Sequence, residues 1–185
     1  MGILEDSLKD VPIVKKGDYN YFVHPITDGV PLMTRELLED VLERILAITS
    51  GGYTKVVGVE SMGIPLSTAY SLKTGVPQVI VRKRSYGLKG EVEVSQKTGY
   101  SKGTLYINGV GPGDRLLLLD DVFSTGGTIR AVIKGLLSTG AALEDVVIVF
   151  DKSQPGIKEE IEEETGVEIK TLLRVDVSEG RVVML

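Results

Sequence analysis

Cysteine is absent from the 185 residues of this chain, which also has no tryptophan and only one histidine. The absence of cysteine excludes a disulfide framework and any metal site built on thiolates, and it is consistent with a reducing compartment. No apolar run approaches the roughly 20 residues of a membrane-spanning helix, and the first residues lack the apolar core of a signal peptide. We therefore expect a cytoplasmic protein that has no membrane partner.

Positive charge is also scarce, since 21 Lys and Arg residues face 26 Asp and Glu residues. The resulting net charge of −5 and pI near 5.0 are not typical of a protein that binds the phosphate backbone of nucleic acid. A local site on an acidic protein can still be positive, so a small anionic ligand remains open. The composition is that of an ordinary soluble globular protein, and the length suits a single domain over residues 1–185.

Strand and helix patterns alternate along most of the chain. Residues 34–49 place apolar side chains at helical spacing, and Thr34 can cap that helix. The elements expected after it are strands at 55–61, 76–84, 116–121, 146–152, 168–175 and 180–185, and helices at 64–74, 127–139 and 155–165. This order predicts an α/β fold with a mostly parallel, Rossmann-like sheet flanked by helices. Ligands of such sheets bind beyond the carboxyl ends of the strands.

Two segments do not follow the alternation. Residues 1–33 precede the first strand of the core, and we call them the hood segment. Residues 85–107 separate two core strands by more than a crossover needs, and the apolar alternation at 92–94 and 105–107 predicts a two-stranded flap. A long excursion inside a compact domain is usually a functional lid or a disordered loop. We therefore expect a flexible catalytic flap at 85–107.

The stretch LLLLDDVFSTGGT, residues 116–128, is the most unusual in the chain. A leucine run of this length indicates a strand buried on both faces, and Asp120 and Asp121 stand where it emerges. Two adjacent carboxylates raise each other's pKa unless a pair of ligand hydroxyls or a divalent cation compensates. Residues 124–128 are small and lead into a helical pattern, whose N-terminal N–H groups can bind phosphate without a basic side chain.

The simpler interpretation of this stretch is a strand–turn–helix whose hydroxyl groups cap the helix. Capping explains neither the paired aspartates nor the paired glycines at 126–127. Other phosphate-binding patterns do not fit, because G-x-x-x-x-G-K-[ST] is missing from the chain. GVGPG at 109–113 precedes a strand instead of following one, so we interpret it as a turn and not as a dinucleotide fingerprint.

VFSTGGT preceded by LLDD resembles the signature of the type I phosphoribosyltransferases, which bind phosphoribosyl pyrophosphate (PRPP). The resemblance runs from about residue 20 to the end of the chain. It is strongest to the archaeal hypoxanthine/guanine phosphoribosyltransferases through YFVHPITDGVP, GVESMGIPL and RKRSYGLKGEVEV, and IVFDKSQPG is also similar to bacterial xanthine phosphoribosyltransferases. The resemblance implies the type I fold and transfer of ribose 5-phosphate from PRPP to a purine nitrogen, with Mg²⁺ bound and pyrophosphate released.

By this resemblance, Asp120 and Asp121 hold the ribose hydroxyls, directly or through Mg²⁺. The residues that cradle the 5′-phosphate are Ser124, Thr125, Gly126, Gly127 and Thr128. Those that bind pyrophosphate are Glu60, Ser61, Met62, Gly63, Arg82, Lys83 and Arg84, of which Arg82 and Lys83 are also catalytic candidates. In several members of the family these basic residues reach the site from the neighbouring subunit of a homodimer. Without the resemblance, ESMG would be interpreted as an ordinary strand–helix turn. Residues 82–84 would then be solvent-exposed charges at the end of a strand.

Base recognition depends on three further residues. Lys152 resembles the family lysine that donates to O6 of a 6-oxopurine, Val122 contacts the base plane, and His24 lies where the xanthine enzymes carry base-contacting residues. Lys152 and His24 could instead be a surface lysine and a structural histidine. A cationic donor at O6 favours hypoxanthine, guanine or xanthine over adenine, whose 6-amino group is itself a donor.

The sequence indicates less clearly which flap residues contact the substrates and which group removes the proton from the purine. Tyr86 and Lys89 are candidates for contacts in the closed state, which excludes water from an oxocarbenium-like transition state. Ser124 stands where hypoxanthine/guanine enzymes of the bacterial and animal type carry an aspartate base, and serine is a poor proton acceptor. Glu91 or Glu93 of the flap are the alternatives.

Two other functions stay open at this point. Adenine phosphoribosyltransferase has the same fold and PRPP site, and its pocket differs by one or two side chains. A non-catalytic regulator could use the fold to sense PRPP, but the chain shows no added DNA-binding module and is acidic. We expect a purine-salvage enzyme that acts on hypoxanthine and guanine with PRPP and Mg²⁺, as a homodimer that binds no nucleic acid.

Overall fold

The computed structural model describes residues 2–16, 19–97, 102–178 and 180–185. Its centre is a six-stranded sheet in the order β10-β9-β8-β7-β3-β4, in which all neighbours are parallel except β9 and β10. Its strands are β3 (Lys55–Val59), β4 (Gln78–Val81), β7 (Arg115–Phe123), β8 (Ala142–Asp151), β9 (Ile169–Ser178) and β10 (Arg181–Met184). This sheet confirms the predicted mostly parallel α/β fold.

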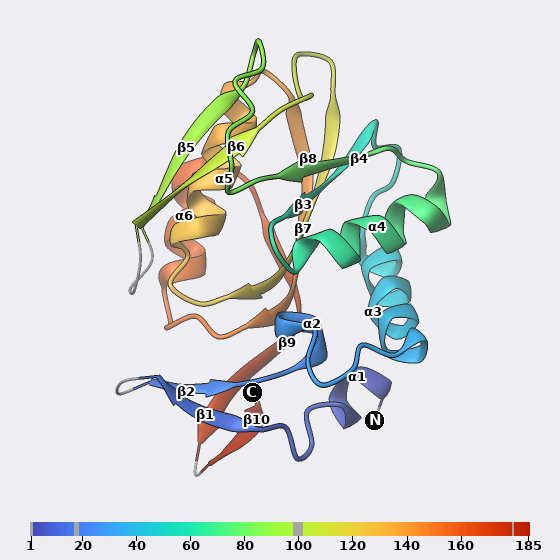
Figure 1. Cartoon of the computed structure of the whole chain (residues 1–185), viewed down its shortest axis with the longest axis vertical. Coiled ribbons are helices and arrows are strands. Elements are labelled where there is room, and N and C mark those ends of the chain that lie inside the picture. Colours follow the sequence, from blue (N-terminus) through green and yellow to red (C-terminus); the bar gives the residue numbers. More distant parts are fainter. Residues whose placement is uncertain (1, 17–18, 98–101, 179) are drawn as a thin grey trace.

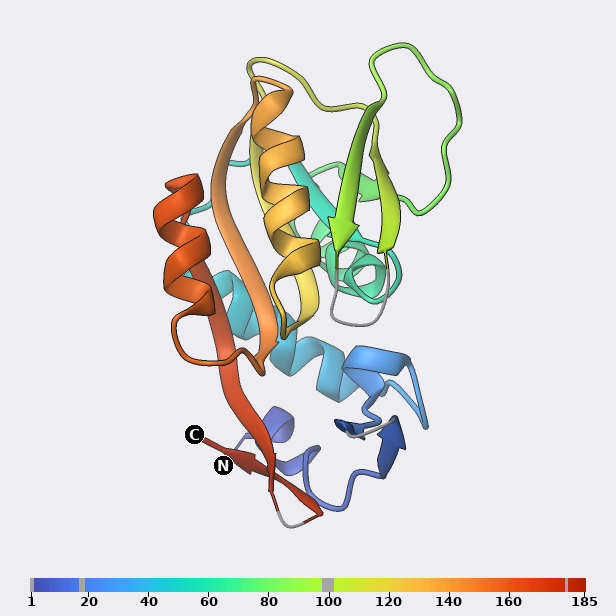
Figure 2. The ribbon, with the colours of Figure 1, turned by 90° about the vertical axis from the view of Figure 1, so that its left-hand side faces the viewer.

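Helices cover both faces of the sheet (Figures 1 and 2). One face packs against α3 (Arg35–Ile48) and α4 (Gly63–Thr74), and the other against α5 (Gly127–Ser138) and α6 (Ile157–Thr165). Local signals set the ends of these helices. The Thr34 hydroxyl accepts the N–H of Leu37 at 3.3 Å at the start of α3, and Gly75 and Gly166 end α4 and α6. The predicted helices therefore form within one or two residues of their expected bounds.

The leucine run of β7 is buried on both faces, as predicted. Leu116 and Leu118 belong to the core between the sheet and α5 and α6. Leu117 and Leu119 point the other way, into the core beneath α3 and α4. Because successive side chains of a strand alternate between faces, only a strand between two helix layers needs such a continuous apolar run.

The hood segment contains α1 (Ile3–Asp6), α2 (Pro25–Asp28) and a hairpin of β1 (Ile13–Lys16) and β2 (Tyr19–Phe22). It lies beyond the carboxyl ends of the sheet strands, next to β9 and β10 (Figures 1 and 2). Glu5 accepts from both Arg44 guanidinium nitrogens at 2.7 and 2.6 Å, and these bonds lower the pKa of Glu5 to about 2. The hood is thus anchored to α3 by a charged pair that joins distant parts of the chain.

The predicted excursion divides into two parts. The hairpin of β5 (Val92–Lys97) and β6 (Lys102–Ile107) pairs Val92 with Ile107 and Val94 with Leu105. Its inner side chains are buried in the same core as α5, so this part is built into the fold and does not hang free as a flap. Residues 83–90 are exposed, and the closing motion of this loop stays a prediction.

No helix among the described residues is long and apolar enough to cross a membrane.

Candidate active site

The paired aspartates lie in the last residues of β7, at the carboxyl edge of the sheet. Asp120 is only 7% exposed, and its Oδ1 accepts the backbone N–H of Asp121 at 3.0 Å. Burial raises the pKa of Asp120 to about 6, although the nearby charge of Lys83 acts in the opposite direction. Burial and the charge of Asp120 also raise the pKa of Asp121 well above its ordinary value. The pair is therefore unfavourable as two anions until something outside the chain compensates it.

Neither carboxylate forms an ion pair within the part of the chain that the structure describes. The same residues contain no group of three His, Cys, Asp or Glu side chains that could hold a metal ion by themselves. Mg²⁺ usually binds through one or two carboxylates together with water and substrate phosphate oxygens. Asp120 and Asp121 fit that pattern, and they fit direct bonds from a diol equally well.

The small loop after β7 leads into α5 through a glycine that cannot be replaced without strain. Gly126 is the N-cap and has φ +75°, the left-handed region that favours glycine. A Cβ there would lie 2.6 Å from Ile161 Cδ1, so the position also lacks space. Gly126 has no side chain to cap the first turn of α5, which suits N–H groups that bind a phosphate.

The turn after β3 lies against the same edge of the sheet. A Cβ on Gly63 would lie 2.7 Å from the Leu119 carbonyl oxygen and 3.3 Å from Asp120 Oδ1, so α4 begins directly beside the aspartates. The Glu60–Ser61 peptide bond is cis. Glu60 Oε2 accepts the N–H of Lys83 at 3.0 Å and lies 3.0 Å from Arg82 Nε. The Glu60 side chain thus orients the basic segment.

The basic segment continues the edge of the sheet. Arg82 exchanges two backbone hydrogen bonds with Tyr106 at 2.9 and 2.7 Å, which ties the end of β4 to β6. Lys83 and Arg84 are exposed, and the guanidinium carbon of Arg84 lies 5.9 Å from the Tyr86 ring centroid. Tyr86 and Lys89 are also exposed in the loop.

Glu91 organises the exposed loop. It accepts hydrogen bonds from Asn108 Nδ2 at 2.8 Å, from Ser85 Oγ at 2.5 Å and from the Tyr86 N–H at 3.0 Å. These bonds lower the pKa of Glu91 to about 2. A carboxylate held in this way is a poor proton acceptor, which argues against the hypothesis that Glu91 removes the purine proton.

Lys152 lies between the strand ends and the hood. Its backbone N–H donates to the Phe123 carbonyl at 2.7 Å. Its side-chain Nζ lies 4.7 Å from the Phe22 ring centroid and 5.6 Å from the Tyr21 ring centroid. Burial lowers the pKa of Lys152 to about 8, while the charges of Asp176 and Asp28 act to raise it. Val122 pairs with Phe150 across β7 and β8, so it belongs to the same region. The structure thus brings Lys152 and Val122 together beneath the hood.

His24 has a different role from the one its position suggested. Its side chain is 0% exposed, its Nδ1 accepts the Ile26 N–H at 3.1 Å, and its Nε2 lies 2.8 Å from Ser7 Oγ. Burial lowers the pKa of His24 to about 4, so the ring is neutral at pH 7. With both ring nitrogens engaged inside the hood, His24 caps α2 and joins it to α1, which argues against a direct contact with the base.

Sequence reasoning did not find Tyr21, Phe22 and Asp28. Phe22 packs edge-on against Phe150 at 5.7 Å, and the Tyr21 hydroxyl donates to Asp28 Oδ1 at 2.6 Å. The only local signal was a cluster of aromatic residues outside the α/β core, and that signal does not say which strand end the aromatic residues will cover.

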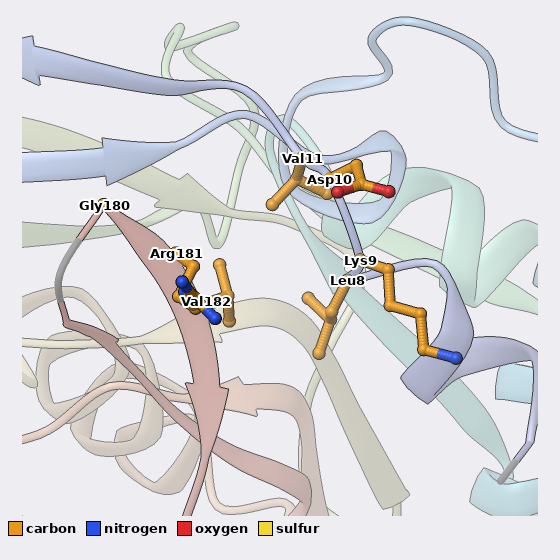
Figure 3. A pocket seen from close by; sticks show the side chains of 7 residues that line it. All are labelled: Leu8, Lys9, Asp10, Val11, Gly180, Arg181 and Val182. Atoms are coloured by element: carbon orange, nitrogen blue, oxygen red, sulfur yellow. The ribbon is translucent and has the colours of Figure 1, made fainter.

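A hollow of about 550 Å³ lies between the hood and the C-terminal hairpin (Figure 3). It is bordered by Leu8, Lys9, Asp10, Val11, Gly180, Arg181 and Val182. These residues belong to the hood, to β10 and to Gly180 just before it, and they include none of the predicted site residues.

Comparisons with known proteins agree with the geometry. The chain is 54% identical to the hypoxanthine/guanine phosphoribosyltransferase of Methanothermococcus okinawensis over 100% of both chains, and 52% identical to that of Methanocaldococcus infernus over 98% of both. Among solved structures, it resembles the adenine phosphoribosyltransferase of Rhodothermus marinus, with a TM-score of 0.72 and 25% identity over 92% of this chain and 96% of that one. It also resembles the enzyme of Giardia lamblia complexed with 9-deazaadenine, with a TM-score of 0.76 and 22% identity over 96% and 99%. The profile of the phosphoribosyl transferase domain matches residues 34–177, and the chain therefore belongs to that family.

Proposed function

We propose that this protein is a purine-salvage enzyme that transfers ribose 5-phosphate from PRPP to hypoxanthine or guanine and forms IMP or GMP with release of pyrophosphate. The observation that supports it best is the pair of buried Asp120 and half-buried Asp121, which forms no ion pair among the described residues and lies at the end of β7, a short loop before the N-terminus of α5. A ribose diol with a phosphate at its 5′ end matches that order of groups.

The chain supplies positioning and charge in this reaction. Asp120 and Asp121 hold the ribose hydroxyls, directly or with Mg²⁺, and Ser124 to Thr128 hold the 5′-phosphate. Bound Mg²⁺ would neutralise charge on the leaving pyrophosphate. The N–H groups of Ser61 to Gly63 and the cations of Lys83 and Arg84 stabilise the same charge as it develops.

Lys152 is the residue that selects the class of base. Its ammonium donates to O6 of hypoxanthine or guanine, while the 6-amino group of adenine offers it no acceptor. The two solved structures are adenine phosphoribosyltransferases, but at 25% and 22% identity they share far less sequence with this chain than the relatives at 54% and 52%. Hypoxanthine and guanine are therefore preferred to adenine in this proposal.

Assembly and location complete the proposal. A homodimer, in which Arg82 to Arg84 approach the neighbouring site, and a cytoplasmic address are expected for this enzyme class. Light scattering of the purified protein would test the dimer, and a monomer at working concentrations would contradict it.

A competition assay tests the reaction and its base together. The protein receives PRPP, Mg²⁺ and equal amounts of adenine, hypoxanthine, guanine and xanthine, and the nucleotides are resolved. IMP and GMP are expected, and chelation of the metal should abolish both. AMP as the main product would replace the proposal with an adenine transferase. PRPP binding without any nucleotide would favour a sensor.

A variant of Lys152 tests the assignment of the base pocket. Lys152→Ala should reduce turnover of hypoxanthine and guanine by about 10- to 100-fold, because a charge-assisted hydrogen bond contributes about 1.5–3 kcal/mol. Any residual adenine activity should change far less. Equal losses for both classes of base would remove Lys152 from contact with O6.

A further inference from the structure

Asp28 is the last residue of α2, and its carboxylate is held in a defined orientation by its own segment. Oδ1 accepts a hydrogen bond from the Tyr21 hydroxyl at 2.6 Å. Oδ2 accepts hydrogen bonds from the Thr27 hydroxyl at 2.6 Å and from the backbone N–H of His24 at 3.0 Å. No ion pair to Asp28 is formed within the residues that the structure describes. A carboxylate oxygen can accept two hydrogen bonds, so Oδ1 retains capacity for a donor from outside the hood.

Two distances and one electrostatic effect place Asp28 near Lys152 and the turn after β3. The next residue is Gly29, where a Cβ would lie 3.7 Å from Met62 Cε, so the end of α2 lies beside the turn after β3. The Tyr21 hydroxyl that bonds to Asp28 belongs to a ring whose centroid lies 5.6 Å from Lys152 Nζ. The charge of Asp28 acts on both Lys152 and Asp121. Asp28 therefore lies near the O6 donor as well as the ribose end of the site.

The edges of purine bases differ in a way that an acceptor near Lys152 can detect. Hypoxanthine and guanine present O6 as an acceptor and the adjacent N1–H as a donor, and adenine presents the reverse pattern. At the next position guanine has an amino group, hypoxanthine has hydrogen, and xanthine has a carbonyl oxygen. An ionised carboxylate only accepts hydrogen bonds, so it attracts N1–H and the 2-amino group and repels the 2-oxo group.

We propose that Asp28 reads the N1–C2 edge of the base, so that it favours guanine and excludes xanthine while Lys152 binds O6. This assignment rests on the proposed function and deepens it. Lys152 separates 6-oxopurines from adenine, and Asp28 then separates the 6-oxopurines from one another. The pair reads two adjacent positions of the ring with opposite charges.

Asp28→Asn is the most direct test, because asparagine keeps the size of the side chain and one acceptor oxygen. That oxygen can still accept the His24 N–H and the Thr27 hydroxyl, while the new amide group donates. The kcat/KM for guanine should fall by about 10- to 100-fold, the equivalent of one charge-assisted hydrogen bond. The kcat/KM for xanthine should rise, because the amide can donate to its 2-oxo group. A guanine-to-xanthine ratio that stays as in the wild type would overturn the assignment.

Asp176→Asn is the matched control. Asp176 is an exposed residue of β9, and its charge also acts on Lys152, so its removal changes the net charge and the surroundings of Lys152 in the same way. The guanine-to-xanthine ratio should stay unchanged in this variant. If Asp176→Asn shifts the ratio as much as Asp28→Asn does, the effect arises from the charge of Lys152 and Asp28 does not read the base.

The wild-type protein provides a second measurement that needs no variant to fold. It should bind GMP at least about 10-fold more tightly than XMP in equilibrium titrations, for the same hydrogen-bond energy. Equal affinity for the two nucleotides would overturn the role of Asp28 and leave the proposed function intact. A wild-type protein that forms neither IMP nor GMP would overturn the proposed function, and the role of Asp28 with it.

Discussion

Two buried groups of carboxylates lie at opposite ends of the same sheet. Asp145, near the start of β8, is 2% exposed, and Asp120, near the end of β7, is 7% exposed. Asp145 accepts hydrogen bonds from the Tyr53 hydroxyl, from Lys170 Nζ at 2.5 Å and from the Ser50 N–H at 3.0 Å. Burial alone would raise the pKa of Asp145, but these donors lower it to about 2. The pKa of Asp120 is instead raised, to about 6.

The difference separates a carboxylate with partners inside the chain from the pair to which we assign a role in binding the ribose. Asp145 meets its partners inside the chain, so its charge contributes to the stability of the fold. Asp120 and Asp121 form no ion pair among the described residues, and burial raises the pKa of both. Asp120 also lies deeper among protein atoms than Asp145, so burial and the supply of donors together set the opposite pKa shifts of the two carboxylates.

The largest expected effect is on activity. Asp120→Asn combined with Asp121→Asn should lower kcat/KM for PRPP by about 10²- to 10⁴-fold, because two charge-assisted hydrogen bonds of about 1.5–3 kcal/mol each are lost. Thermal unfolding should occur at the same temperature as in the wild type or higher, since two uncompensated charges are removed. Steady-state kinetics with varied PRPP measures the effect, and unchanged turnover would remove the ribose-diol assignment.

The counterpart at the other end of the sheet should show the opposite pattern. Asp145→Asn should lower the free energy of unfolding by about 3 kcal/mol, because it leaves the Lys170 ammonium without its buried partner. Urea denaturation at pH 7 measures this loss. The kcat/KM for PRPP should remain that of the wild type where the variant is folded, and a large drop there would contradict the separation of the two roles.

The pH dependence of stability should have opposite signs at the two sites. The pKa of Asp120 rises from 3.8 to about 6 on folding, so its contribution is greatest below pH 4 and is lost as the pH rises through 6. The pKa of Asp145 falls from 3.8 to about 2, so its contribution is present above pH 4 and is lost as the pH falls toward 2.

Denaturation of the wild type and of the Asp120→Asn, Asp121→Asn variant at several pH values tests the direction of the pH dependence at Asp120 and Asp121. The variant should become more stable relative to the wild type as the pH rises from 4 to 7, because it removes both carboxyl groups whose pKa values folding raises. A difference that stays constant over this range would mean that the buried pair does not titrate there.

The smallest expected effect concerns one donor to Asp145. Tyr53→Phe removes a single hydrogen bond and leaves those from Lys170 and Ser50, so it should cost about 1–2 kcal/mol of unfolding free energy. Tyr21→Phe is the control, because it removes a comparable hydrogen bond from a tyrosine hydroxyl in the hood. A loss as large as that of Asp145→Asn would show that the Tyr53 hydroxyl provides most of the stabilisation of Asp145, and not a single hydrogen bond among several.

Much of the fold could be predicted because its signals are local. The apolar period at 34–49, the leucine run at 116–119 and the turn glycines at 75 and 166 all act within a few residues of where they stand. The family and the aspartate–glycine motif followed from the same kind of signal. For residues 85–107 the sequence predicts the two-stranded hairpin but not its burial. That burial depends on α5, which lies further along the chain.

The sequence by itself determined which residues form strands and helices, and it placed two aspartates and a small loop where a parallel strand ends. Only the tertiary structure decided that Glu60 orients Arg82 and Lys83, that His24 is enclosed by the hood, and that Asp28 lies near Lys152. It also decided which buried aspartate is paired. The physical reason is that secondary structure depends on neighbours in the chain, while the charge state of a carboxylate depends on donors brought to it from distant segments.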